Sequence, residues 1–195
     1  MATARRTALL LRVSQSCAAA FVERGDTSTT IAELAERAEI SERTFYRCFA
    51  TKEESIWPML DDGNRSLAAA LGEQPRDSGL APAVRNAFVA SVGESFEAMT
   101  RSLMPIIFSD AALRRVWESA TFETMELIRP EVARLIDRPE TSLDTTAAAG
   151  QATLAVVAAL REMADHRTPA PAAINRALDA FSTSHLSHPT GKEQS

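Results

Sequence analysis

Apolar residues recur every three or four positions along most of this chain, which is the period of an α-helix. In the first third of the sequence, the pattern predicts helices over residues 5–24, 31–38 and 42–49, and then a longer helix over 52–72. Gly25 stands where a helix commonly ends, and the polar run "DTSTT" separates the first helix from the second.

The rest of the chain is also predicted to be helical. Its helices are expected over residues 82–99, 111–137, 143–167 and 172–186, with a short apolar segment over 103–108. Pro130 is expected to interrupt the second of these helices, because proline removes a backbone donor. No segment shows the alternation of a strand, so we expect an all-α protein of about nine helices.

Two of the predicted helices are short and are joined by about three residues. A longer helix precedes them, which is the arrangement of a helix-turn-helix unit. Thr30 and Glu33 have the spacing of a capping box, and Ser41 stands where it caps the next helix. We therefore expect a DNA-binding domain over residues 1–51, a helical domain over 52–188 and a disordered tail over 189–195.

The outward face of the helix over 42–49 carries the candidate DNA contacts. Since Phe45 and Phe49 are expected to face inward, Arg43, Tyr46 and Arg47 must project outward. Arginine reads guanine edges, and a tyrosine hydroxyl donates to phosphate. The alternative is a solvated helix face on which both arginines pair with nearby glutamates.

The segment "TTIAELAERAEISERTFYRCFATKEE" (29–54) resembles the DNA-binding signature of the TetR family of transcriptional regulators. The resemblance rests on the threonine that opens the second helix, the "IAELAERA" run, the "IS--T-Y--F" pattern and the "KE" that starts the fourth helix. It implies a three-helix DNA-binding unit, completed by the start of helix four. Behind it, the resemblance implies a helical domain that binds a small effector and dimerises.

The resemblance also implies roles for individual residues. Thr30 would hold a phosphate at the N-terminus of the second helix, and Lys52 would contact phosphate at the start of the fourth. The residues that would face bases or backbone are Ser41, Arg43, Thr44, Tyr46 and Arg47, with Tyr46 on phosphate.

Two positions depart from the family pattern. Glu39 stands in the turn where the family usually has glycine, and a left-handed backbone there would cost about 1 kcal/mol. Pro58 falls inside the predicted fourth helix and is expected to bend it, either as a fixed kink or as a hinge.

Methionine and aromatic side chains concentrate between residues 88 and 125. Apolar pockets between the helices of a bundle are common ligand sites, and methionine adapts to irregular cavities. The alternative is ordinary core. The candidate ligand-binding residues are Phe88, Phe96, Met99, Met104, Phe108, Trp117, Phe122 and Met125.

The run "TTAAAGQATLAVVAAL" combines small residues with apolar ones. Small residues permit close approach of helices, and in the family the last two helices of each subunit form a four-helix dimer interface. The alternative is that these helices pack only on their own domain. The candidate interface residues are Ala148, Gly150, Leu154, Val157, Leu160, Ile174, Leu178 and Phe181.

Charge is distributed unevenly along the chain. Residues 1–55 hold eight Lys/Arg and eight Asp/Glu, whereas the rest hold thirteen and eighteen. The balance of charge alone therefore does not indicate a nucleic-acid partner. In a dimeric DNA-binding protein, the acidic second half would stay away from the phosphates.

Other classes of protein find little support in the sequence. It shows no Ser/His/Asp set, metal-ligand spacing or glycine-rich phosphate loop, so we expect neither an enzyme nor a bound cofactor or metal. Cys17 and Cys48 are expected to be free thiols. The apolar runs are shorter than a membrane span, and the N-terminus lacks a signal-type cleavage site, so we expect a cytoplasmic protein with no membrane partner.

The sequence therefore predicts a dimeric regulator that binds a palindromic operator in double-stranded DNA. We expect a repressor that a small apolar or amphipathic effector releases, and the second half also resembles sensor domains for acyl-CoA-like ligands. The alternative is a DNA-binding regulator whose second half only dimerises or binds a protein partner.

Overall fold

The computed structural model describes residues 2–183, apart from the side chains of residues 2–4, 94–96 and 183. The tail predicted over 189–195 lies outside the described residues. Within them every regular element is a helix, which confirms the all-α class. In chain order the elements are α1 (Ala2–Arg24), α2 (Ile31–Arg37), α3 (Glu42–Cys48), η1 (Glu53–Ile56), α4 (Trp57–Gly72), η2 (Arg76–Ser78), α5 (Leu80–Ser109), α6 (Ala111–Ile136), α7 (Leu143–His166) and α8 (Ala170–Thr183).

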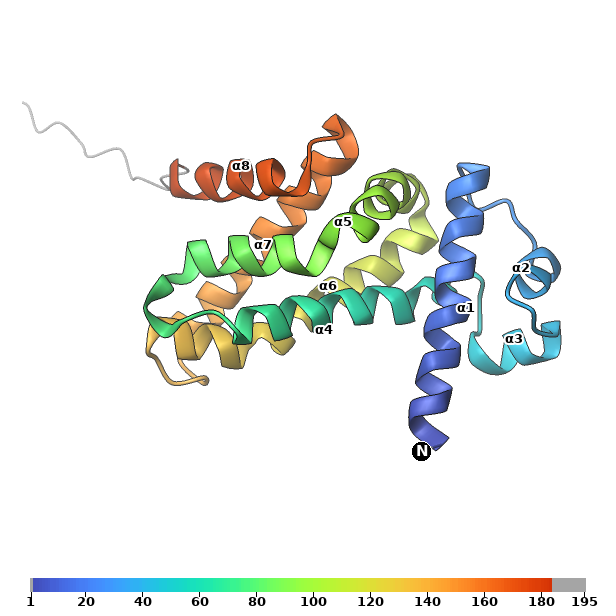
Figure 1. The fold of residues 1–195 in the computed structure, drawn as a ribbon, viewed down its shortest axis with the longest axis horizontal. Coiled ribbons are helices and arrows are strands. Elements are labelled where there is room, and N and C mark those ends of the chain that lie inside the picture. The colour runs from blue at the N-terminus through green and yellow to red at the C-terminus, as the bar shows by residue number, and fades with distance from the viewer. Residues whose placement is uncertain (1, 184–195) are drawn as a thin grey trace, which may run out of the picture.

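The helices form two groups on either side of α1 (Figure 1). The short helices α2 and α3 lie on one side and, with α1, form the N-terminal head. Helices α4–α8 lie on the other side and form the C-terminal bundle, and α1 packs on both α4 and α5. The head thus rests on the two helices that begin the bundle.

Two apolar clusters stabilise this arrangement. The bundle cluster is built from α4–α8, around residues such as Phe88, Ile128 and Met163. The head cluster contains Phe21 and Phe45 but also residues 103–117 of the bundle. Because burial of apolar area drives packing, the C-terminal part of α5 and the start of α6 are fastened to the head.

Helix α5 differs from the prediction. It runs from Leu80 to Ser109, so the apolar segment expected at 103–108 is the end of this helix and not a separate element. Gly93 interrupts it with φ 52° and ψ 165°, a conformation that glycine alone adopts readily. Counted as two segments on either side of this kink, α5 brings the α-helical segments among residues 2–183 to the predicted nine.

Two prolines also behave differently from the prediction. Helix α4 begins at Trp57, after the 3-10 turn η1, which places Pro58 in its first turn. The backbone N–H that proline lacks would be unpaired there in any case, so Pro58 neither bends α4 nor acts as a hinge within it. Helix α6 continues through Pro130 to Ile136 without the expected interruption.

One helix among the described residues, α7, is long and apolar enough to cross a membrane, although only a third of its most apolar window is buried. One face of α7 packs into the bundle through small residues, including Ala149, Ala152 and Ala159. The apolar residues on this face of α7 therefore belong to the core of the bundle, whereas Leu154 is exposed to solvent.

Candidate DNA-binding surface and effector cavity

The turn before α3 has the geometry of a Schellman motif. Glu39 has φ 55°, its N–H donates to the Glu36 carbonyl, and the Ile40 N–H donates to the Ala35 carbonyl. The left-handed residue that the family pattern suggested is therefore present, and a glutamate occupies it. Ser41 then caps α3 by accepting from the Thr44 N–H at 3.2 Å.

Helix α3 presents a cationic face to solvent. Phe45 and Phe49 are buried and in contact with each other, which directs Arg43, Tyr46 and Arg47 outward. Tyr46 is 57% exposed. Within residues 2–183, neither arginine forms an ion pair or hydrogen bond, so the predicted alternative of pairing with glutamates is not observed.

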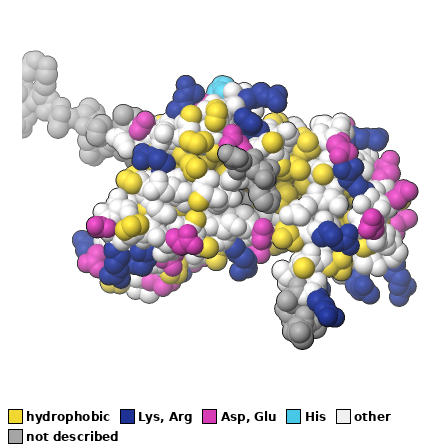
Figure 2. Space-filling view, in the orientation of Figure 1, with side chains coloured by type: hydrophobic (Ala, Val, Ile, Leu, Met, Phe, Trp, Pro, Cys, Tyr) yellow, Lys and Arg dark blue, Asp and Glu magenta, His cyan; other side chains and the backbone are white. Residues whose placement is uncertain are grey.

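Cationic side chains also lie on this side of the molecular surface. Figure 2 shows Lys and Arg side chains at the lower right, the side on which α3 lies in Figure 1. Ser41 and Thr44 lie at the start of this face and are 2.9 Å apart through their hydroxyl oxygens. The two hydroxyls thus already form a hydrogen bond with each other, and a phosphate that approaches them would compete with this bond.

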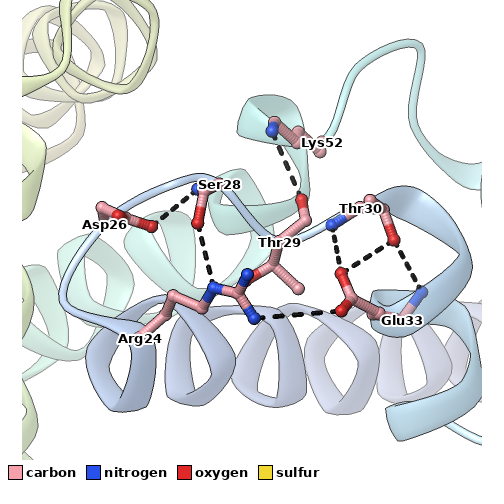
Figure 3. A network of polar contacts seen from close by, with 7 residues as sticks. All are labelled: Arg24, Asp26, Ser28, Thr29, Thr30, Glu33 and Lys52. Atoms are coloured by element: carbon pink, nitrogen blue, oxygen red, sulfur yellow. Dashed lines mark hydrogen bonds and ion pairs between the residues drawn. The ribbon is translucent and has the colours of Figure 1, made fainter.

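Thr30 forms a complete capping box with Glu33. The Thr30 N–H and hydroxyl donate to the Glu33 carboxylate at 2.7 and 2.8 Å, and the Glu33 N–H donates back at 3.3 Å (Figure 3). The bonds from Thr30 lower the pKa of the Glu33 carboxyl, first through the backbone N–H and then through the hydroxyl. A carboxylate therefore already stands where a phosphate was expected, and Arg24, at 3.9 Å, partly balances it.

Lys52 is directed into the protein. Its ammonium donates to the carbonyl oxygen of Thr27 at 2.5 Å. It also donates to that of Thr29 at 3.3 Å, the contact that Figure 3 draws. These carbonyls belong to the loop between α1 and α2, so Lys52 fastens this loop to the start of the bundle. The expected phosphate contact would have to use the remaining N–H of this ammonium.

The bundle contains a cavity of about 140 Å³ between α4, α5, α6 and α7. Four of the candidate ligand residues line it: Phe88, Met99, Met104 and Trp117. The prediction missed the contributions of α4 and α7, such as Met59, Leu60 and Val156. Leu160 also lines the cavity, although it was predicted at the dimer interface.

The other candidate ligand residues do not line this cavity. The rings of Phe108 and Trp117 form a T-shaped pair with centres 5.1 Å apart, and the Arg161 guanidinium lies over the Phe108 ring, 4.3 Å from its centre. Phe122 is 74% exposed, and Met125 packs against the bundle cluster. The Phe96 side chain lies outside the described residues.

The candidate dimer residues divide into buried and accessible ones. Ile174 is fully buried in the bundle and Leu160 lines the cavity, so both side chains pack inside this chain. Leu154 and Phe181 are exposed. The half-buried candidates are Ala148, Gly150, Val157 and Leu178. Leu143, at the start of α7, is a further exposed apolar side chain that the sequence analysis did not name.

The fold combines a helix-turn-helix head with a larger helical bundle, the arrangement that helix-turn-helix regulators have. The comparison with known families finds a match in the head, where the model of bacterial regulatory proteins of the tetR family matches residues 17–54. Residues 17–54 thus carry the signature of the tetR family of bacterial regulatory proteins, the family that the sequence analysis named.

Solved structures share the whole fold. A protein described as a TetR-family regulator from Mesorhizobium loti MAFF303099 is 20% identical, with a TM-score of 0.54 over 92% of this chain and 98% of that one. Another from Rhodococcus sp. is 18% identical, with a TM-score of 0.60 over 91% and 97%. The comparison with curated proteins found no match.

Proposed function

We propose that this regulator binds a palindromic operator as a homodimer and responds to a small effector held in the bundle. The observation that carries the proposal is the face of α3, where Arg43 and Arg47 stand exposed and unpaired within the described residues. Guanidinium groups free of internal partners are ready to contact base edges and phosphates. Two such helices about 34–36 Å apart would read successive turns of the major groove.

The surface of the last two helices supports the homodimer. Leu154 on α7 is 55% exposed, Leu143 at the start of α7 is more so, and Phe181 on α8 is exposed too. Exposed large apolar side chains on adjacent helices are costly in water and are typical of an interface. A second copy of the same face would cover them, as a two-fold axis requires.

The cavity supports the effector response. It lies where the two apolar clusters meet, since Phe88 belongs to the bundle cluster and Trp117 to the head cluster. A small apolar or amphipathic molecule bound there would change how the two clusters pack. Release of DNA on binding, and hence repression, follows as the proposed mode of action of a cytoplasmic protein.

Replacing Leu154 with glutamate tests the dimer. We expect Leu154→Glu to be monomeric by light scattering and to bind operator DNA far more weakly, whereas Phe122→Glu, on exposed α6 surface, stays dimeric. A dimer that persists in Leu154→Glu would refute the interface. If a broad ligand panel never changes DNA affinity, the bundle serves only dimerisation or a protein partner.

A further inference from the structure

The polar lining of the bundle cavity has an unusual composition. Among the described residues, Asp62 is the one ionisable side chain that lines the cavity, and no described arginine or lysine does so. Two arginines that lie within a few positions of lining residues form ion pairs with glutamates, Arg101 with Glu97 and Arg114 with Glu118. A bound anion would therefore meet a carboxylate and no compensating cation.

Of the five neutral polar side chains in the described lining, three already donate to backbone carbonyls, whereas the hydroxyls of Ser66 and Thr100 keep their protons. The Asn64 amide donates to the Ala120 carbonyl at 3.0 Å, which leaves its oxygen available. The hydroxyls of Thr121 and Ser91 donate to the carbonyls of Trp117 and Phe88, both at 2.9 Å. Each hydroxyl has thereby used its only proton and offers lone pairs alone.

Asp62 itself is half-buried and free to accept. It makes no hydrogen bond or ion pair with any residue in the described part of the chain. The Arg65 guanidinium donates its hydrogen bond to Asp61, at 2.8 Å. This bond is the main cause of the raised pKa of Arg65, and the charge of Asp62 adds only a small part. The carboxylate thus stands at the cavity without a partner of opposite charge.

From this lining we propose that the cavity binds a small organic cation, an apolar body carrying a protonated amine that donates to Asp62 and the neighbouring acceptors. This inference rests on the proposed effector role of the cavity and narrows its chemistry. An ammonium group supplies the positive charge that the described lining lacks and donors for the carboxylate of Asp62, and the aromatic and methionine walls suit an apolar body.

The volume limits the size of the ligand. A cavity of about 150 Å³ in an engineered protein holds benzene, so the 140 Å³ here suits a molecule of about six to ten non-hydrogen atoms. The phosphates of an acyl-CoA need arginine or lysine partners. The lining therefore disfavours the acyl-CoA-like effector that the sequence suggested.

Three probes of nearly equal shape test the inference: benzylamine, benzyl alcohol and benzoate, which differ in charge. By titration calorimetry on the full chain we expect benzylamine to bind most tightly and benzoate least. Asp62→Asn should weaken benzylamine about tenfold or more while leaving benzyl alcohol unchanged. The matched control, Asp77→Asn, removes an exposed carboxylate of η2 outside the cavity lining and should leave benzylamine binding unchanged.

Several outcomes would overturn the inference: benzoate or butyryl-CoA binding more tightly than benzylamine, equal loss in Asp77→Asn and Asp62→Asn, or no binding of benzylamine at about 10 mM. DNA binding is measured on the same preparations. If DNA binds and benzylamine does not, this inference fails while DNA recognition stands. If benzylamine binds through Asp62 without changing DNA affinity, the cation site stands and the effector response fails.

Discussion

The Thr27 hydroxyl donates a hydrogen bond of 2.7 Å to the Asp110 carboxylate. Thr27 lies in the loop between α1 and α2 of the head, whereas Asp110 begins α6 of the bundle and accepts from the N–H groups of Ala112 and Leu113. Lys52 holds the carbonyl of the same Thr27. One loop of the head is thus fastened to the bundle by a carboxylate and an ammonium.

Removing the Thr27 hydroxyl should loosen this attachment. In Thr27→Val the shape is kept and one hydrogen bond is lost, so we expect the free energy of unfolding to fall by about 1 kcal/mol. Hydrogen exchange should quicken in the α1–α2 loop. Thr168→Val removes a comparable bond to Glu162 in the bundle and should leave exchange in that loop unchanged. Equal exchange in both variants would show that the bond does not hold the loop.

The same carboxylate makes stability depend on pH. The Leu113 N–H, followed by the Thr27 hydroxyl, lowers the pKa of Asp110 below its ordinary value. Its contribution is therefore present above the unfolded pKa, near 4, and is lost as pH falls through the lower folded pKa. Urea unfolding should show Asp110→Asn less stable than the wild type at pH 7, with the gap narrowing toward pH 2. A gap that does not change with pH would contradict this assignment.

Glu39 carries backbone strain that glycine would relieve. We expect Glu39→Gly to raise the free energy of unfolding by about 1 kcal/mol, because φ 55° disfavours any residue with a Cβ. Glu39→Ala removes the same charge but keeps the Cβ, so it separates strain from electrostatics in chemical denaturation. Equal stabilisation by both substitutions would assign the effect to charge.

Lys52 is expected to act on DNA through the loop that it holds. Lys52→Met should weaken binding to all sequences and lower stability, yet leave the dependence of affinity on salt nearly unchanged, since its ammonium is bonded to carbonyls. Anisotropy titrations over a range of salt concentrations measure this slope. A slope reduced by about one released ion would instead identify Lys52 as a phosphate contact.

Local signals in the sequence predicted the head well. The helical period alone directs Phe45 and Phe49 inward and Arg43 outward, and capping residues mark where α2 and α3 begin. The break in α5 was missed, although Gly93 in the middle of an apolar helical pattern was a usable signal.

The cavity and the loop attachment depend on contacts between distant segments. Met59 and Leu60 line the cavity because of how α4 crosses α5 and α7, which no periodicity encodes. Thr27 and Asp110 are 83 positions apart and carry no pattern that links them. Phe122 belonged to an aromatic group by sequence, yet the rotation of α6 turns it to solvent.

Selection of DNA from a random pool tests the role of α3 most directly. We expect the wild-type protein to select a palindrome, and Arg43→Ala and Arg47→Ala each to lose preference at particular half-site positions, at a cost of about 1–3 kcal/mol per contact. Arg76→Ala, on exposed η2 surface of the bundle, serves as the control and should select the wild-type sequence. If both α3 variants select that same sequence with undiminished affinity, this helix does not read the operator.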